Sequence, residues 1–343
     1  MNLKELSQNL GLSQTTVSRA LNGYPEVSEA TRMRVQTAAR QFNYTPSTRA
    51  KGLATGKALA IGHVIPMSSK HEMVNPIFGD FIAGAGETYA RHGYEMILSI
   101  LDGSTDEETV YRGLKSRRAV DGVVVHGPRM DDPRIPLLRE IGLPFVVHGR
   151  ASGVKDPYAW VDVNNRRAFQ RATDFLIDLG HRRIALINGI ETMDFAHRRR
   201  AGYEDALAAH DISVDPTIMV GDEMTEHFGY QTTSRMLSMD HPPTAFICAS
   251  MICALGVRRA IEDRGQVMGR DVSIVSHDDA LSYLQNGADV PIFTATRSSV
   301  RDAGRQVGEM LINQITDPDA AAAQVLLETE LMVGMSTGPA PQS

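Results

Sequence analysis

The strongest constraint on the fold is an alternation that begins at Ala58, where short apolar, β-branched runs take turns with segments typical of helices. Such alternation favours parallel sheets, because two parallel strands need a long crossover connection between them. The strand candidates are ALAIGHVIP, YEMILSIL, VDGVVVHG, PFVVHG, RRIALING, TAFICAS and DVSIVSHDD. Helices are expected to begin near Ile77, Asp106, Pro133, Arg166, His197, Glu226, Ile252 and Val300. The repeated set fits two similar lobes better than one doubly wound domain, with a ligand in the cleft at the strands' carboxyl ends.

The residues before this alternation predict a small all-helical head. Asn2 and Glu5 form a capping box for a first helix, and Gly11 then turns the chain. Ser13 is suited to cap a second helix that ends near residue 21, and Ser28 a third that ends near residue 42. A helix, a tight glycine turn and a second helix is the spacing of the helix-turn-helix, in which the second helix lies in the major groove of DNA.

The second expected helix has one apolar and one polar side. Gln14 and Thr15 stand at its N-terminus, where reading helices reach base edges, and Arg19 can bond bidentately to guanine or to a phosphate. Charge supports a polyanionic partner for the head alone, since residues 1–60 carry eight Lys/Arg against three Glu, a net +5. The rest of the chain has 27 basic and 38 acidic residues, a net −11.

The head resembles the DNA-binding domain of the LacI/GalR family of bacterial transcription regulators. The likeness runs from Leu3 to Pro46 and is carried by TVSRALNG, VSEATR and NYTP. It implies base contacts from Gln14, Thr15 and Arg19, and backbone contacts from Ser13, Thr16 and Ser18. It also implies that the segment after NYTP is a hinge that folds on operator DNA, with Leu53 wedged into the minor groove. The basic, glycine-containing composition of residues 47–57, which include Arg49, fits order that comes with DNA binding.

The body resembles the effector domain of the same family, which is similar to a periplasmic sugar-binding protein with two lobes and three crossovers. The segments LGHRRIALING, PTAFICAS and GRDVSIVSHDD carry this likeness. The expected fold is thus a helix-turn-helix head plus a two-lobed α/β effector domain with parallel sheets. The expected parts are a DNA-binding domain at 1–46, a hinge at 47–57, an effector domain at 58–336 and a flexible tail at 337–343. Within the effector domain we expect an N-lobe of about 58–162 and 294–320, and a C-lobe of about 163–293 and 321–336.

Two charged residues lead the expected effector site. Asp278 ends a strand and Arg199 lies near the start of a helix, and the family carries ligand-binding Asp and Arg residues at these positions. A carboxylate that accepts two hydroxyls and a guanidinium fork that donates to vicinal oxygens suit a sugar. Asn75 and Phe78 match a family segment beside the ligand, where Phe78 is suited to stack on a pyranose ring. Further candidates at strand ends are Asp102, His126, Arg150 and Ser250.

Some positions depart from the family pattern and point to a different effector. Ser250 and Met251 stand where the family often has Asn-Asp, and His277 replaces a frequent Tyr. A larger or less evenly hydroxylated ligand is therefore expected. PFVVHGR resembles the α-glucoside-responsive regulators of soil bacteria, which favours a disaccharide.

Other classes of protein lack their signatures in this chain. There is no GxSxG elbow, P-loop or HExxH, and GAGETYARHG falls in an expected helix, so we expect no enzyme. Cys248 and Cys253 do not match a zinc-ligand pattern, and neither a metal nor a cofactor is expected. No membrane span or signal peptide is recognisable, so a cytoplasmic protein is expected.

These observations predict a repressor of carbohydrate-utilisation genes. A homodimer would place two reading helices on a pseudo-palindromic operator, and a sugar would release it. The C-terminal STGPAPQS has no heptad helix, which favours dimers over helix-bundled tetramers. The alternatives are a purine- or other small-molecule-responsive co-repressor and, more remotely, a sugar-processing enzyme with a DNA-binding head.

Overall fold

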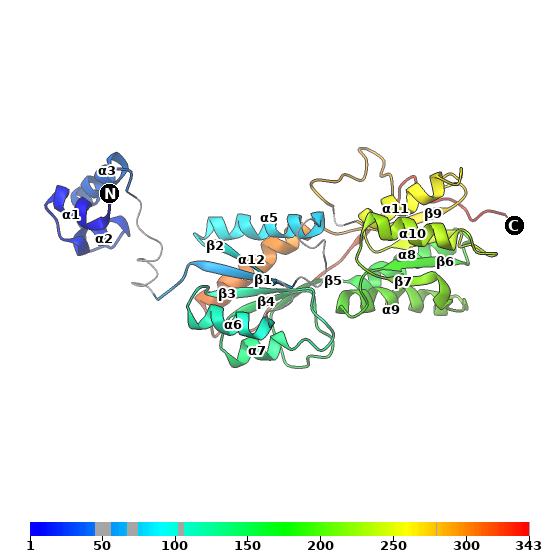
Figure 1. The fold of residues 1–343 in the computed structure, drawn as a ribbon, viewed down its shortest axis with the longest axis horizontal. Helices are drawn as coiled ribbons and strands as arrows, with labels where there is room; N and C mark the ends of the chain where they lie inside the picture. Colours follow the sequence, from blue (N-terminus) through cyan, green and yellow to red (C-terminus); the bar gives the residue numbers. More distant parts are fainter. Residues whose placement is uncertain (45–55, 67–74, 102–105, 279, 343) are drawn as a thin grey trace. The chain divides into compact units, whose positions relative to one another are not determined.

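The computed structural model describes residues 1–44, 56–66, 75–101, 106–278 and 280–342. The chain divides into two compact units, Met1–Leu59 and Ala60–Ser343. The first is drawn in dark blue and the second in light blue to red in Figure 1. Each unit is described separately.

The head unit contains the three expected helices, α1 (Leu3–Leu10), α2 (Gln14–Leu21) and α3 (Glu29–Gln41). The capping box of Asn2 with Glu5 is present, and Ser13 and Ser28 cap α2 and α3 through their hydroxyls. Gly11 ends α1 with φ of 63°, a conformation that glycine adopts without strain. The three helices share a core of Leu6, Leu10, Val17, Ala20, Val35, Ala38 and Ala39.

The first lobe of the larger unit, the N-lobe, is built on a parallel sheet with the strand order β11-β5-β4-β3-β1-β2. Its strands are β1 (Ala60–Pro66), β2 (Glu95–Leu101), β3 (Gly122–His126), β4 (Phe145–His148), β5 (Trp160–Val163) and β11 (Gln324–Leu327). Its helices are α5 (Pro76–Arg91), α6 (Glu107–Ser116), α7 (Arg134–Glu140) and α12 (Val300–Thr316). Figure 1 shows α5 and α12 on one face of the sheet and α6 and α7 on the other.

The C-lobe repeats this design with the order β12-β10-β9-β8-β6-β7, in which β10 and β12 pair antiparallel and the other neighbours are parallel. Its strands are β6 (Ile184–Asn188), β7 (Met219–Gly221), β8 (Ala245–Cys248), β9 (Ser273–Asp278), β10 (Thr294–Arg297) and β12 (Glu330–Met332). Its helices are α8 (Asn165–Asp178), α9 (Asp194–Ala209), α10 (Glu226–Met236) and α11 (Met251–Glu262). The two-lobed α/β fold and the seven expected strands are confirmed.

Three connections join the lobes: β5 to α8, β10 to α12, and β11 to β12. The last two exchange points lie a few residues later than the sequence predicts. Residues 294–297 form β10 in the C-lobe sheet, and residues 324–327 form β11 in the N-lobe sheet. Strands of four residues are too short for their pattern to indicate which sheet they join.

The end of the chain also differs from the expected flexible tail at 337–343. Within its described residues, the Gly338 N–H donates to Ser273 Oγ at 3.1 Å and the Ala340 N–H donates to Leu179 O at 2.9 Å. The Gly, Pro and Ser composition predicts flexibility, but partners in the C-lobe satisfy these backbone groups.

Glycines allow the helices of each lobe to cross closely. A Cβ atom on Gly84 of α5 would lie 2.0 Å from the Arg301 carbonyl oxygen of α12. One on Gly256 of α11 would lie 2.0 Å from the Glu226 carbonyl oxygen of α10. The helices can therefore pack this closely only with glycine at these two positions.

Candidate functional site

The polar face of α2 in the head is open to solvent. Val17 and Ala20 are buried in the core, while Gln14, Thr15 and Arg19 are exposed on the opposite side. Within the described part of the chain, no hydrogen bond or ion pair restrains the Arg19 guanidinium group. The face therefore has the reach and the donors to contact a polyanion.

The other predicted DNA-contacting residues of α2 support the helix terminus. Ser13 is exposed, and Thr16 and Ser18 are half-buried. Ser13 Oγ accepts the Thr16 N–H at 3.0 Å and lies 2.8 Å from Thr16 Oγ1. Arg49 and Leu53, predicted for the hinge, lie outside the described residues, as does Asp102 of the predicted effector site.

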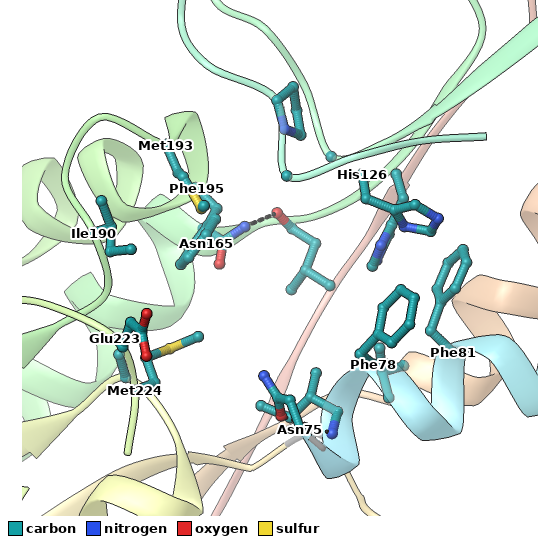
Figure 2. Close-up of a pocket in the computed structure, with 18 of the residues that line it drawn as sticks. Asn75, Phe78, Phe81, His126, Asn165, Ile190, Met193, Phe195, Glu223 and Met224 are labelled. Atoms are coloured by element: carbon teal, nitrogen blue, oxygen red, sulfur yellow. Dashed lines mark hydrogen bonds between the residues drawn. The ribbon is translucent and has the colours of Figure 1, made fainter. Parts of the chain in front are cut away.

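A cavity of about 500 Å³ lies between the two lobes at the carboxyl ends of their strands. Figure 2 shows the N-lobe residues His126, Phe78 and Phe81 on one side of it and the C-lobe residues Ile190 and Phe195 on the other. Its wall combines apolar and aromatic side chains with polar ones, a combination that suits a small-molecule site. The further polar side chains on its wall are Asn75, Glu107, Arg129, Arg134, His148, Asp162, Asn165, Thr192, Arg199, Asp222, Glu223, Thr225, Glu226, His277 and Ser298.

Arg199 reaches the cavity wall from α9 and is held in a fixed orientation. Its Nε donates to Asn165 Oδ1 at 2.8 Å, and its Nη1 donates to the Ala249 carbonyl at 2.9 Å. Its guanidinium carbon lies 4.7 Å from the ring centroid of Phe195 and 5.2 Å from that of Phe169. The group is 7% exposed, so its charge is presented from a site with little access to water.

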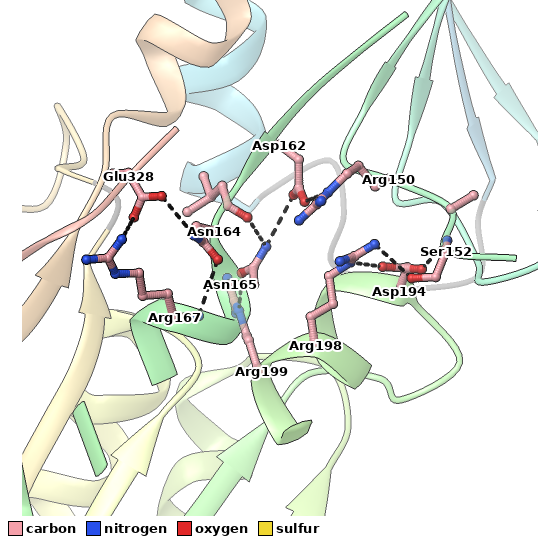
Figure 3. Close-up of polar contacts among 12 residues, drawn as sticks. Arg150, Ser152, Asp162, Asn164, Asn165, Arg167, Asp194, Arg198, Arg199 and Glu328 are labelled. Carbon is pink, nitrogen blue, oxygen red and sulfur yellow. Dashed lines mark hydrogen bonds and ion pairs between the residues drawn. The ribbon is translucent and has the colours of Figure 1, made fainter. Parts of the chain in front are cut away.

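A chain of polar contacts continues from Asn165 into the N-lobe (Figure 3). Asn165 Nδ2 donates to Asp162 Oδ1 at 3.3 Å, and Arg150 Nε donates to Asp162 Oδ2 at 2.6 Å. Burial raises the pKa of Asp162, and the adjacent Arg150 opposes this rise. Arg150 also lies over the ring of Trp160 and does not line the cavity, so it acts here through Asp162.

The N-lobe wall combines aromatic rings with an amide. Asn75 caps α5 by accepting the Ile77 N–H at 3.0 Å, and Phe78 follows in the first turn. His126 ends β3 with its ring edge-on to Phe78 and Phe81, at centroid distances of 5.4 and 5.1 Å. Asn75, Phe78 and His126, all predicted from the sequence, therefore meet on one wall.

Behind this wall lies a second histidine, which the sequence does not single out. His63 of β1 is fully buried, and its Nδ1 lies 2.8 Å from His126 Nε2. Burial, and secondarily the nearby His148, lowers the pKa of His63 to about 3. The pKa of His126 is also well below its ordinary value, chiefly because of burial. Both rings are therefore neutral at physiological pH.

Two predicted residues remain to be placed. Ser250 is buried and does not line the cavity; its hydroxyl accepts the Cys253 N–H at the start of α11. Asp278 is the last residue of β9, next to cavity-lining His277, and only its backbone is described. The sequence reasoning missed Asp162, Asn165 and Phe195. The polar run after VDV, and the spacing of four residues between Phe195 and Arg199 on one helix, are the signals that indicate them.

Two sets of hydrogen bonds join the N-lobe to the C-lobe. Asp80 of the N-lobe accepts both the N–H and the hydroxyl of Ser282, at 2.7 and 2.5 Å. Asp194 of the C-lobe accepts the Ser152 N–H of the N-lobe at 2.6 Å and is paired with Arg198 (Figure 3). Both carboxylates are buried. We call these contacts the two latches, because each joins one lobe to the other.

No group of three or more His, Cys, Asp or Glu side chains among the described residues is arranged to hold a metal ion. No described helix is long and apolar enough to cross a membrane.

Comparison with known protein families gives two matches. Residues 2–47 match the family described as bacterial regulatory proteins of the lacI family, and residues 173–337 match the periplasmic binding protein-like domain. The transcriptional regulator AglR of Rhizobium meliloti is 44% identical over 342 residues, which cover 99% of this chain and 95% of the relative.

Solved structures of transcriptional regulators superpose on nearly the whole chain. The complex of the regulator CelR with cellobiose superposes with a TM-score of 0.72 at 28% identity, covering 98% of this chain and 99% of that one. The lac repressor dimer bound to operator and an anti-inducer superposes with a TM-score of 0.84 at 25% identity, with the same two coverages. With a matching head, a matching two-lobed body and a relative that is 44% identical over nearly its full length, the chain belongs to the LacI family of bacterial transcriptional regulators.

Proposed function

We propose that this chain represses carbohydrate-utilisation genes as a cytoplasmic homodimer on a pseudo-palindromic operator, and that a sugar, with a disaccharide preferred, releases it. In this proposal residues 1–46 bind DNA, 47–57 form the hinge and 58–336 bind the effector. The observation that supports it most directly is Arg199, whose guanidinium group is fixed by Asn165 and Ala249 in the wall of a cavity between two lobes.

The composition of the cavity supports a sugar. Phe78 and Phe195 come from opposite lobes and both line the cavity, and aromatic rings are suited to pack on the apolar C–H surface of a pyranose ring. Asn165 holds the Arg199 guanidinium group on the cavity wall, where a guanidinium fork suits vicinal hydroxyl groups, and Asp278 at the end of β9 is proposed to accept hydroxyls. A volume of about 500 Å³ lies within the usual range for small-ligand sites, and the similar CelR structure holds a disaccharide, cellobiose.

Binding without turnover is part of the proposal. Two charged groups on the wall already have partners that do not line the cavity: Arg134 pairs with Asp132 at 2.6 Å, and Asp162 pairs with Arg150 at 2.6 Å. Both pairs lie within the N-lobe and hold the lining residues in place.

For the head, we propose that Gln14, Thr15 and Arg19 read bases and that Ser13, Thr16 and Ser18 contact the backbone, with Arg49 and Leu53 acting in the hinge. The exposed polar face of α2 supports the first part. The lac repressor dimer on its operator, which superposes on this chain, supports a dimer that meets two half-sites.

The test is selection of genomic DNA fragments by the purified full chain, repeated with a panel of mono- and disaccharides and purines. The proposal expects one palindromic site, enriched without additive and lost with one sugar. Arg19→Ala is expected to weaken that site by about 1–3 kcal/mol and to relax preference at one base pair. If a DNA fragment is enriched only when a purine or a sugar is present, the small molecule promotes DNA binding and acts as a co-repressor. If the protein converts the bound sugar into a product, the proposal that it binds the sugar without catalysis is wrong.

A further inference from the structure

Tyr89, His63 and His126 form one hydrogen-bonded series that runs from the N-lobe core to the cavity wall. Tyr89 Oη lies 3.0 Å from His63 Nε2, and His63 Nδ1 lies 2.8 Å from His126 Nε2. Tyr89 is 1% exposed and His63 is 0% exposed, whereas His126 lines the cavity. The series therefore connects a buried hydroxyl to a ring that a ligand can touch.

The direction of these hydrogen bonds follows from counting protons. Among the described residues, His63 Nε2 is the one acceptor recorded for the Tyr89 hydroxyl, so Tyr89 donates and His63 Nε2 accepts. Burial keeps both imidazoles neutral, and a neutral imidazole carries one N–H. His63 therefore has its proton on Nδ1 and donates it to His126 Nε2. His126 must then carry its own proton on Nδ1.

The opposite direction is unfavourable. It would leave the Tyr89 O–H without an acceptor in the core, and a buried donor without a partner is costly. The His126 ring is also fixed in place, edge-on to Phe78 and Phe81, while its carbonyl accepts from Arg134 Nη2 at 3.0 Å. His148 is 6.1 Å away by ring centroids, and no hydrogen bond to the His126 ring is recorded for it.

We propose that Tyr89 and His63 are positioning residues that hold His126 in the Nδ1–H form, so that this part of the cavity presents a hydrogen-bond donor and selects a ligand oxygen that accepts. The assignment of the ligand as a sugar rests on the proposed function, whereas the protonation of the His126 ring is independent of it. A ring or glycosidic oxygen only accepts, and a hydroxyl also satisfies the donor, whereas a ligand group that only donates is rejected here.

The first experiment reads the tautomer directly, without a ligand. The full chain is labelled with ¹⁵N-histidine, and long-range ¹H–¹⁵N correlations identify the protonated nitrogen of each ring. His126→Asn and His63→Gln serve to assign the signals. The proposal expects Nδ1–H for both His63 and His126 near neutral pH. A His126 ring protonated on Nε2 overturns it, whatever the effector is.

The matched variants are Tyr89→Phe and Tyr203→Phe, which each remove one buried hydroxyl from a different lobe. The Tyr203 hydroxyl donates to the Ile184 carbonyl in the C-lobe and has no connection to His126. Tyr89→Phe removes the donor that begins the series, so the His126 signals are expected to shift toward a mixture of tautomers. Tyr203→Phe is expected to leave them unchanged. Unchanged signals in Tyr89→Phe, or equal shifts in both variants, contradict the positioning role.

The second experiment measures selectivity, using the sugar found by fragment selection and its monodeoxy and deoxyfluoro analogues. At one ring position the deoxy analogue is expected to bind about twofold to tenfold more weakly, while fluorine, which accepts but cannot donate, restores part of the affinity. Tyr89→Phe is expected to reduce this difference, and Tyr203→Phe to retain it. A deoxy penalty that is the same in wild type and Tyr89→Phe overturns the link between the series and selectivity. If no sugar binds, the proposed function fails while the tautomer result still stands.

Discussion

Arg199 is the residue at which ligand recognition should be most sensitive to a conservative change. Its guanidinium group is held by Asn165 and the Ala249 carbonyl and lies against the rings of Phe169 and Phe195. Lysine keeps the charge but has no planar fork to make these contacts. We expect Arg199→Lys to lower effector affinity by about tenfold to a hundredfold, measured by calorimetry. Operator affinity without effector, measured by fluorescence anisotropy, is expected to stay the same.

Arg200, the next residue of α9, provides the control. Its guanidinium group pairs with Glu191 and Glu204 and is partly exposed. Arg200→Lys is therefore expected to change effector affinity by less than about twofold, because pairs of this kind contribute little. Equal losses in the two variants would show that Arg199 acts through the stability of α9 and not through the ligand.

The buried histidine His63 predicts loss of stability in mild acid. Its pKa is about 3 in the folded protein and about 6.5 when unfolded, so between these values the unfolded state binds an extra proton. The contribution of neutral His63 to the free energy of unfolding is fully present above pH 6.5, and it is lost progressively as the pH falls below that value. His63→Gln keeps an acceptor and a donor but cannot titrate in this range. Between pH 7.5 and 5.0, urea unfolding should show wild type losing about 2 kcal/mol more than His63→Gln. Equal losses would contradict a neutral buried His63.

How far the sequence predicts the site depends on what a residue does. Arg199, Asn75 and Phe78 follow from family motifs, and the structure places all three on the cavity wall. Asp162 and Asn165 act through contacts between segments that are distant in the sequence or lie at a lobe crossing. His63 has no local signal at all, since one histidine in an apolar strand looks like an ordinary core residue.

Among the helices, the crossing of α10 and α11 is the element contact most easily tested. A Cβ atom on Gly256 would lie 2.0 Å from a backbone oxygen of Glu226, which cannot move aside as a flexible side chain does. Gly256→Ala is therefore expected to lower the free energy of unfolding by about 1–3 kcal/mol or more. Gly79 of α5, where a Cβ atom meets nothing within 4 Å, is the control. Gly79→Ala should raise stability by about 0.5–1 kcal/mol, because alanine favours a helix. Loss of stability in both would contradict a specific steric cause.

Elements with strong local signals were predictable, and short ones were not. The caps Asn2, Ser13 and Ser28 define the helices of the head from a few residues each. The strands missed by the sequence reasoning, β5, β7, β10, β11 and β12, have three or four residues and lie at sheet edges or lobe crossings. Such strands are defined by their pairing partners, so local periodicity carries little information about them.

At the scale of the whole effector unit, the lobes are related by three crossings and two latches. The crossings are covalent and fix which ends of the sheets face each other. The latches, Asp80 with Ser282 and Asp194 with Ser152, are hydrogen bonds that must break if the lobes separate. Two buried carboxylates therefore contribute to the contacts between the lobes, beside others such as the Asp194 N–H, which donates to the Pro128 carbonyl at 2.9 Å.

Removing one latch tests this dependence. Asp194→Ala leaves Arg198 without its carboxylate partner and the Ser152 N–H without its acceptor, so open forms should become more populated. Because apparent affinity falls with the fraction of closed molecules, the effector should bind about threefold to thirtyfold more weakly. Amide hydrogen exchange should rise at residues 149–153 and 190–198, and effector should reverse that rise.

A carboxylate that serves only one lobe is the matched control for the latch. Asp205 pairs with Arg166 on the C-lobe surface, with both groups partly exposed. Asp205→Ala is expected to leave effector affinity and exchange at the lobe contacts unchanged, since it removes charge without touching the N-lobe. If Asp194→Ala unfolds the C-lobe, exchange will rise across β6 and β8 as well. Asp80→Ala, which breaks the latch on the other side, then decides the question. Unchanged effector affinity with intact sheets in Asp80→Ala and Asp194→Ala would show that closure does not rest on these carboxylates.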